Sequence, residues 1–336
     1  DGRPLGRRRR IEKRDVHMSD PSMVPGSHLV TPHTEYSGRG LVEMSRGCPE
    51  KCRYCWVSYN YGKLRSYPTE GILERVDRLR DVTSRVGFVA TAVGDHPELA
   101  EILAACRSRN LNVALSSLRI PAMREEILRP LADSGARSVT IAPETGTDSL
   151  RKRLNKPITN NAILEAVETA QRCGIPSLKM YFIVGLPGEC DEDLDGIGSL
   201  LREARKLVIS HGRSRGNVGD LTAGFNVLVP KPYTPYSREA MLSRAETRRR
   251  MKRIEETVAG LPNLKIDWPS YRQAQWQAYL SRGDSKVFEA IEMAASGAGL
   301  GTLLADNRQA VDISTLEREV GDPPVWRFIT SAPSSS

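Results

Sequence analysis

Residues 41–55 read LVEMSRGCPEKCRYC, and the interpretation of the fold starts from them. The short apolar run 41–44 predicts a strand, and a turn that contains Gly47 follows it. Three cysteines then stand in the spacing CxxxCxxC, within eight residues. Disulfide frameworks usually belong to shorter, secreted chains, so this clustering indicates metal binding in a reducing compartment.

Strand and helix patterns alternate from this stretch to about residue 237. Continuous apolar runs predict six strands, and apolar residues at i, i+3 and i+4 predict helices between them. The expected strands are 41–44, 86–93, 111–115, 138–142, 178–184 and 224–229; the expected helices are 69–84, 99–106, 122–134, 163–173 and 191–208. Such runs are typical of parallel strands that are covered on both faces. The pattern therefore predicts an α/β fold with a parallel sheet, curved into a partial (β/α)6 barrel.

The rest of the chain predicts two flanking segments. Residues 1–38 lack apolar periodicity, and seven of the first fourteen are Arg or Lys, so we expect a basic linker or tail. We expect residues 39–237 to form the barrel core. Residues 238–336 are expected to be a helical C-terminal extension with a polar tail. Because the chain begins with Asp1 rather than Met, we interpret it as a fragment or a processed product.

Composition is that of a folded protein, with 39% apolar and 27% charged residues among 336. No apolar run reaches the length of about 18 residues that a transmembrane helix needs. No apolar signal segment begins the chain, so we expect a cytoplasmic protein with no membrane partner. The net charge is +8, much of it in the basic tail. That tail is either a solvated linker or a weak contact for nucleic acid or another polyanion.

The clustered cysteines favour an iron–sulfur cluster over zinc. A zinc site usually has four ligands, whereas residues 48–55 offer three thiols and no His lies between residues 34 and 95. A 4Fe–4S cluster held by three cysteines keeps one iron open for a small molecule. Cys106 and Cys173 continue apolar helical stripes and are expected to be buried thiols. Cys190 is expected in a loop that faces the site, as a plain or a reactive thiol.

Candidate site residues lie at the ends of several predicted strands, at the edge where parallel α/β folds place their active sites. They are Gly94 and Asp95 after the second strand, Ser117 and Arg119 after the third, Glu144, Arg153 and Lys156 after the fourth, and Ile183 and Gly185 at the fifth. Asp95 is alternatively the N-cap of the next helix, paired with Glu98. Arg119 suits a ligand carboxylate or a structural ion pair. A buried Glu144 needs a partner, since an unpaired buried carboxylate is costly.

Residues 48–55 resemble the signature CxxxCxΦC of the radical S-adenosylmethionine (SAM) superfamily, in which Φ is aromatic and here is Tyr54. The resemblance extends over about residues 41–235 and implies a partial, TIM-like barrel. It implies that Cys48, Cys52 and Cys55 bind a 4Fe–4S cluster whose open iron chelates SAM. It also implies that the reduced cluster cleaves SAM, and that the resulting 5′-deoxyadenosyl radical takes a hydrogen atom from the substrate.

The same resemblance implies cofactor contacts near the SAM amino and carboxylate groups. Gly94-Asp95 is similar to a Gly-Gly-Glu motif whose backbone meets the amino group, but departs from it. Glu144 stands at a SAM-contacting position. Arg153 or Lys156 is expected near the carboxylate.

An adenine-side contact is implied at the fifth strand. Ile183 and Gly185 are similar to the GxIxGxxE segment of the superfamily. The sequence departs from that segment twice, because Tyr181 replaces the first Gly and Glu189 stands one position late. The alternative is a tight turn that needs Gly and Pro.

Residues 229–235, VPKPYTP, resemble a segment of radical SAM proteins that carry a cobalamin-binding domain. This implies cobalamin on a domain outside these residues, and methyl transfer. One alternative is an RNA-modifying radical SAM enzyme, favoured by the basic tail and by the cationic run 248–253. The non-enzyme alternative is a zinc-binding interaction module. Expected partners are a small-molecule, peptide or RNA substrate and a reductant such as flavodoxin or ferredoxin.

Overall fold

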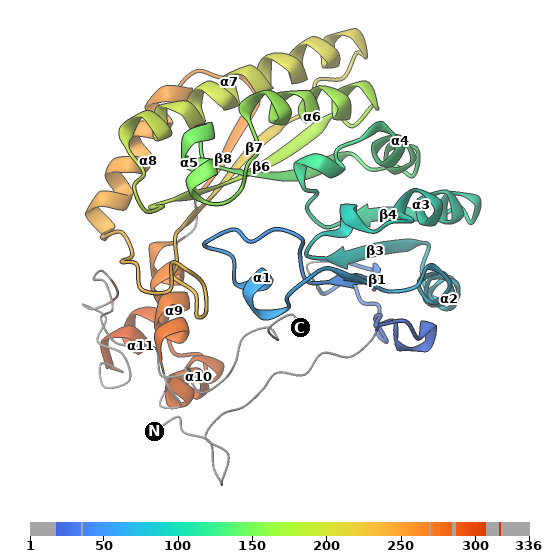
Figure 1. The fold of residues 1–336 in the computed structure, drawn as a ribbon, viewed down its shortest axis with the longest axis horizontal. Coiled ribbons are helices and arrows are strands. Elements are labelled where there is room, and N and C mark those ends of the chain that lie inside the picture. Colours follow the sequence, from blue (N-terminus) through green and yellow to red (C-terminus); the bar gives the residue numbers. More distant parts are fainter. Residues whose placement is uncertain (1–17, 35, 269, 284–286, 307–315, 317–336) are drawn as a thin grey trace.

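The computed structural model describes residues 18–34, 36–268, 270–283, 287–306 and residue 316. A curved layer of strands is covered on its outer side by helices (Figure 1). The strands that correspond to the six expected ones are β1 (Gly40–Arg46), β3 (Arg85–Ala90), β4 (Asn112–Leu115), β5 (Ser138–Glu144), β6 (Ser177–Val184) and β7 (Leu221–Val227). They pair in parallel within each sheet, which confirms the α/β partial barrel.

The five expected helices are also present, with shifted ends. They are α2 (Thr69–Leu79), α3 (Leu99–Ser108), α4 (Glu125–Asp133), α6 (Asn160–Arg172) and α7 (Asp191–Ser214). Two short helices, α1 (Trp56–Asn60) and α5 (Asp148–Arg153), stand in loops at the C-terminal ends of β1 and β5. Beyond β7 lie α8 (Arg244–Val258), α9 (Tyr271–Arg282), α10 (Val287–Ala295) and α11 (Leu300–Asp306). No helix in the described ranges has the length and apolar character to span a bilayer.

The strands form two four-stranded sheets, in the orders β2-β1-β3-β4 and β5-β6-β7-β8. The sequence pattern did not indicate this division. It also did not indicate β2 (Arg65–Ser66), which is antiparallel to β1, or β8 (Leu264–Asp267), which extends the second sheet beside β7. At the border between the sheets, the Leu118 N–H donates to the Thr140 carbonyl at 2.8 Å, just beyond the end of β4.

Each strand buries one face against the helices. Val42 and Met44 of β1 are fully buried in the same apolar core as Ile72 and Val76 of α2. Along β6, buried residues alternate with partly buried ones. Because successive side chains of a strand point to opposite sides, the face of β6 toward the helices is fully covered and its other face is covered in part. Each fully buried apolar side chain contributes about 1.5–3 kcal/mol to folding.

A buried carboxylate fastens α8 to the turn after β6. Glu189 Oε2 accepts hydrogen bonds from the Gly185 N–H at 2.8 Å and from Arg250 Nη1 at 2.5 Å. Among the described residues, Glu189 Oε1 is buried without a hydrogen-bond partner. Burial outweighs the attraction of the arginine and raises the pKa of Glu189 to about 6.

We expect Glu189 to make the protein less stable as the pH rises from about 4.5 to about 6. The folded protein keeps the proton to a higher pH than the unfolded chain does, so losing it favours unfolding. This group lowers the free energy of unfolding by about 2 kcal/mol across that window, and Glu189→Gln removes this part of the slope. Urea denaturation of both proteins at the two ends of the window measures the difference. If the free energy of unfolding changes equally with pH in the wild type and in Glu189→Gln, Glu189 is not the group responsible.

Candidate metal centre and cofactor site

The three clustered cysteines lie on the loop between β1 and α1, at the C-terminal end of β1 (Figure 1). Gly47 starts this loop with a φ of +85°, and a Cβ there would lie 2.2 Å from the Lys63 carbonyl oxygen. A residue with a side chain does not fit at this position. The Cys48 N–H donates to the Gly62 carbonyl at 3.3 Å. The loop is therefore folded back against the segment that follows α1.

The cysteine loop is also fastened to the chain beyond β5. The Arg53 N–H donates to the Leu154 carbonyl at 2.9 Å. Asn155 Nδ2 donates to the Lys51 carbonyl at 2.9 Å. These two bonds hold the second half of the loop against the end of α5, although about a hundred residues separate the partners.

Burial keeps the thiols of Cys48 and Cys52 protonated until a positively charged metal group binds them. It raises the pKa of Cys52 to about 11, against the opposing charge of Lys156. It also raises the pKa of Cys48, which a hydrogen bond from the Glu50 backbone and the charge of Arg119 oppose. The thiolate is the form that binds metal. A metal group therefore supplies the positive charge that these buried sulfur atoms need in order to ionise.

The donor set fits a 4Fe–4S cluster. Cys48, Cys52 and Cys55 are all free thiols on one short loop. In the described part of the chain, no three His, Cys, Asp or Glu side chains converge on one ion position. A 4Fe–4S cluster does not require such convergence, because each cysteine binds a different iron.

Glu144 joins the end of β5 to the cysteine loop. It lies beyond an irregularity in the β5–β6 pairing and has a φ of +68°, in the left-handed region that non-glycine residues rarely adopt. Its Oε1 accepts hydrogen bonds from the Tyr54 hydroxyl at 2.7 Å and from Lys156 Nζ at 2.6 Å. Burial of the hydroxyl and the neighbouring carboxylate raise the pKa of Tyr54 well above 10. Tyr54 therefore stays neutral and donates to Glu144.

Arg119 forms a second link between loops. Its Nη1 donates to Asp95 Oδ1 at 2.6 Å and its Nη2 to Glu50 Oε1 at 2.5 Å. The alternative role of Asp95 as a helix N-cap was wrong, because Glu98 occupies the N-cap position of α3. Asp95 instead ends the short 3-10 helix Val93–Asp95, where the arginine reaches it. Its Oδ2 is buried and has no hydrogen-bond partner among the described residues.

Gly94 and Ser117 differ in how tightly they are packed. A Cβ at Gly94 would lie 2.3 Å from the Cβ of Ala122, so close packing requires glycine there. Ser117 is exposed on the loop after β4. Its neighbour Ser116 is turned to the first sheet, where its Oγ donates to the Ala90 carbonyl at 2.9 Å.

Ile183 lies near the end of β6, and Gly185 follows the last residue of that strand. Ile183 packs with Tyr54 against a small apolar cluster that contains Leu150 and Leu186. Gly185 has a φ of +93°, and a Cβ there would lie 2.7 Å from Leu242 Cγ. Glycine is thus required at this turn for its own packing.

Arg153 and Lys156, both candidates for the SAM carboxylate, have different surroundings. Arg153 is exposed, and its guanidinium donates to the Gly188 carbonyl. Lys156 is half-buried between Glu144 and the Ala142 carbonyl, to which its Nζ donates at 2.7 Å. The structure therefore brings Lys156, rather than Arg153, into direct contact with Glu144.

Sequence reasoning missed Arg151, which organises the loop after β5. Its guanidinium is fully buried and donates to the Pro143 carbonyl at 3.0 Å and the Thr145 carbonyl at 2.7 Å, on either side of Glu144. It also donates to Asp148 Oδ1 at 2.7 Å. The sequence did contain a signal for it: the buried carbonyl groups of a tight loop need hydrogen-bond donors, and a nearby arginine can supply them.

The other cysteines do not belong to the site. Cys106 and Cys173 are buried, as expected, and burial raises the pKa of Cys106 to about 12. Cys190 is exposed at the N-cap of α7, where its Sγ donates to Asp193 Oδ2 at 3.1 Å.

A cavity of about 820 Å³ lies against β1 and β3. Its polar lining includes Glu43, Ser45 and Thr91, and Tyr61 and Arg46 border it beside the cysteine loop. Ser45 Oγ is buried and has no partner among the described residues. The cavity has the size of a small-molecule site.

Comparison with known proteins identifies the family. A model of the radical SAM superfamily matches residues 42–201, from β1 into α7. An uncharacterised protein of Methanocaldococcus jannaschii is 25% identical over 88% of this chain and 62% of its own length. Cytidylyl-2-hydroxyethylphosphonate methyltransferase of Streptomyces wedmorensis is 30% identical over 48% of this chain and 31% of its own length. The chain thus spans less than two thirds of these relatives.

Similarity to solved structures is lower. The radical SAM methyltransferase TsrM of Kitasatospora setae aligns with a TM-score of 0.46 and 16% identity, over 60% of this chain and 36% of that one. Residues 42–201, which include the three cysteines and Glu144, thus belong to the radical SAM superfamily.

Proposed function

We propose that this protein holds a 4Fe–4S cluster on Cys48, Cys52 and Cys55 and binds SAM between that cluster and Glu144. The observation that carries the proposal is the Tyr54–Glu144 hydrogen bond, which ties the cysteine loop to the end of β5. When bound, the cluster supplies the electron that cleaves SAM. The protein's own residues position the nucleotide and exclude water.

Each part of SAM has a chemically matched residue at this edge. Both bonds that the described residues make to Glu144 use Oε1, so Oε2 is available to ribose hydroxyls. The buried, unpartnered Asp95 Oδ2 is an acceptor for the amino group. Ile183, which packs against the same apolar cluster as Tyr54, offers an apolar surface for adenine.

Methyl transfer is the reaction class we propose, on a substrate held in the cavity beside β1 and β3. Its support is the name of the Streptomyces wedmorensis relative, a methyltransferase, together with the VPKPYTP segment. Cobalamin would then be carried outside the residues described. Burial lowers the pKa of Lys231 in this segment, so its amine loses a proton more easily there than in water.

RNA modification is the second candidate, because a tRNA methylthiotransferase of Treponema pallidum is 25% identical over 52% of this chain. The structure weakens one argument for it. Arg249 and Arg253 in the cationic run of α8 form ion pairs with Asp191 of α7, and Arg250 pairs with Glu189. These charges are neutralised within the protein. The basic tail lies outside the described residues up to residue 17.

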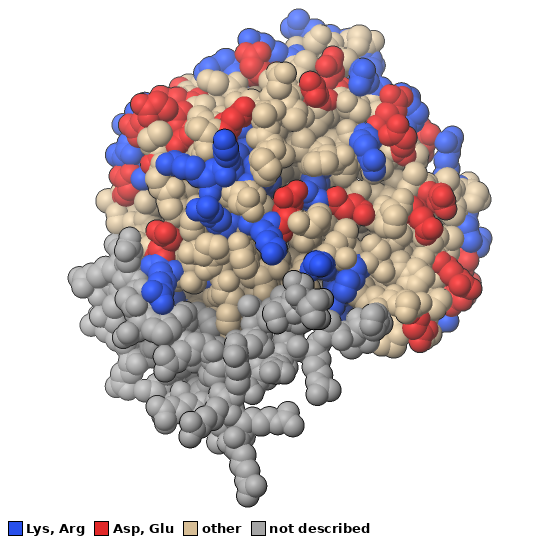
Figure 2. Space-filling model, viewed as in Figure 1, with Lys and Arg blue, Asp and Glu red and all other residues tan. Residues whose placement is uncertain are grey.

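We further propose that an acidic reductant, such as a flavodoxin or ferredoxin, docks on the rim of the cysteine loop. Lys51, Arg53, Lys152 and Arg153 are all exposed there. Figure 2 shows Lys and Arg side chains gathered near the middle of this face, in the region of α5 and the cysteine loop. Complementary charge speeds the encounter of such partners.

Replacing Cys48, Cys52 or Cys55 by Ala is expected to remove the cluster, because two thiolates do not retain it. Iron and acid-labile sulfide, about four of each per chain in the wild type, should fall close to zero after anaerobic reconstitution. Cys190→Ser, which changes an exposed thiol outside the site, should keep both. A cysteine variant that retains the cluster and cleaves SAM would refute the ligand assignment.

Glu144→Gln is expected to weaken SAM binding about tenfold while the cluster remains, since a charge-assisted hydrogen bond contributes about 1.5–3 kcal/mol. Equilibrium binding of SAM to the reconstituted protein measures the dissociation constant, and the visible absorption of the cluster reports its integrity. Glu165→Gln, on the exposed side of α6, is the control. Unchanged affinity in Glu144→Gln would make this carboxylate purely structural.

Charge reversal at the rim is expected to slow reduction by a protein donor. Lys51→Glu with Arg53→Glu should lower the rate with flavodoxin at least tenfold at low salt, and the wild-type rate should itself fall as salt rises. Reduction by dithionite should be unchanged, because it needs no docking. Equal flavodoxin rates in wild type and variant would place the docking surface elsewhere.

A further inference from the structure

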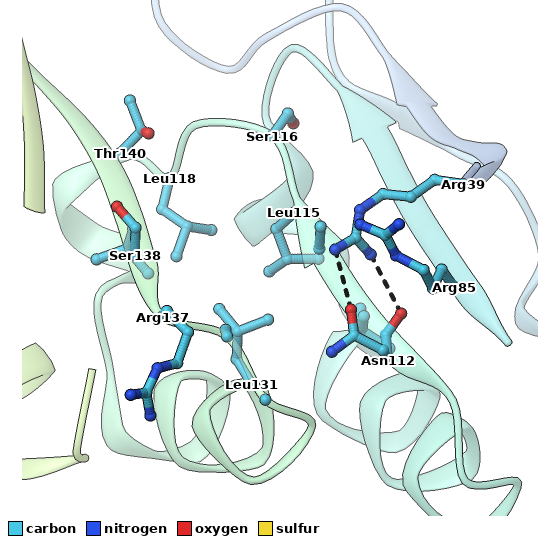
Figure 3. Close-up of a pocket in the computed structure, with 15 residues that line it drawn as sticks. Arg39, Arg85, Asn112, Leu115, Ser116, Leu118, Leu131, Arg137, Ser138 and Thr140 are labelled. Atoms are coloured by element: carbon cyan, nitrogen blue, oxygen red, sulfur yellow. Dashed lines mark hydrogen bonds between the residues drawn. The ribbon is translucent and has the colours of Figure 1, made fainter. Parts of the chain in front are cut away.

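A second cavity, of about 560 Å³, lies at the border between the two sheets (Figure 3). It is bounded by the first residues of β4 and β5, by the segments just before β1 and β5, and by the end of α4. Its polar lining residues are Arg39, Arg85, Asn112, Ser116, Arg137, Ser138 and Thr140. Most of them stand at the N-terminal ends of the strands, whereas the cysteines and Glu144 stand at the C-terminal ends.

The cavity is strongly positive. Three arginines line it, and none of its fifteen lining residues, all of them described, is Asp or Glu. Figure 3 shows the guanidinium groups of Arg39 and Arg85 close together. Burial and, after it, the charge of Arg85 lower the pKa of Arg39. Arg39 is half-buried, and Arg85 is exposed and donates to the Ser37 carbonyl at 3.1 Å. Two adjacent like charges repel each other, and an anion between them removes that repulsion.

Arg39 is held over the paired strands β3 and β4. Its Nη1 donates to the Val86 and Asn112 carbonyls, at 3.3 Å each, and its Nη2 donates to Asn112 Oδ1 at 2.9 Å. Asn112 in turn donates to the Ser134 carbonyl at 2.7 Å. These bonds fix the cation at the wall of the cavity. Fixed donors lose less freedom when a ligand binds.

We propose that this cavity binds the phosphate-like oxyanion group of a small molecule. Arginine forks donate two parallel hydrogen bonds to such a group, and the hydroxyls of Ser138 and Thr140 stand on the facing strand (Figure 3). A tetrahedral oxyanion accepts more of these donors than a carboxylate does. The volume lies within the range of ligand pockets, about 300–1,000 Å³.

This site is distinct from the proposed SAM site, and the inference does not depend on that function. Along β5, the cavity reaches Ser138 to Thr140, and Glu144 ends the strand. Ser116 lines this cavity and also the larger cavity against β1 and β3. A ligand anchored by its anion at the border of the sheets therefore extends toward the barrel interior.

Titration of the reconstituted full chain with inorganic phosphate, followed by calorimetry and by phosphorus NMR line broadening, tests the proposal. Phosphate should bind saturably, and acetate at least tenfold more weakly. Arg85→Gln and Arg137→Gln should each weaken phosphate binding at least tenfold. Arg78→Gln, which removes a cation from the exposed side of α2, should have no effect. Arg39 is left unchanged because it makes three bonds that join β3 and β4, whereas Arg85 makes one, to the Ser37 carbonyl on the exposed surface.

A variant that adds bulk without changing charge distinguishes phosphate binding inside the cavity from a non-specific effect of removing positive charge. Ser138→Leu adds bulk to the cavity at constant charge and should also weaken phosphate binding at least tenfold. Melting curves and cluster content check that each variant is folded. Three results would overturn the proposal: phosphate binding that does not reach saturation, acetate binding as tight as phosphate binding, or wild-type phosphate affinity in Ser138→Leu and the arginine variants.

Discussion

The hydrogen bonds that converge on Glu144 Oε1 are the constraint on which the site depends. A buried carboxylate needs partners, and Tyr54 and Lys156 supply them from two different loops. Tyr54 stands between Cys52 and Cys55, so the bond that satisfies Glu144 also fixes the cysteine loop. Arg151 holds the carbonyls on both sides of Glu144 and so maintains its unusual backbone conformation. The placement of the sulfur atoms is thus linked to the end of β5.

The division of the sheet between β4 and β5 gives the molecule its second functional feature. β4 is only four residues long, and among the described residues its outer edge pairs with no strand. Arg39, bonded to β3 and β4, places positive charge beside the cavity at this border. In a continuous sheet, backbone pairing would close this gap. The C-terminal ends of the strands carry the three cysteines and Glu144, whereas the border between the sheets holds cations at the opposite ends.

The sequence predicts the repeated elements well, because apolar runs and helical stripes are local signals. The six main strands and the five main helices follow from them. It does not predict the border between the sheets, since strand pairing joins distant residues. β8 was not predicted because its four residues, LKID, alternate apolar and charged side chains and form no continuous apolar run. The alternative of Asp95 as an N-cap was wrong because its partner, Arg119, reaches it only in the folded chain. Domain boundaries and the roles of the site residues stay predictions.

Electron paramagnetic resonance of the reduced, anaerobically reconstituted protein, recorded before and after SAM is added, tests the central claim most directly. The account predicts the signal of a reduced 4Fe–4S cluster whose g values shift when SAM binds, because the nucleotide coordinates the iron that no cysteine occupies. A protein that carries no such cluster, or a cluster signal that SAM leaves unchanged, would contradict the account.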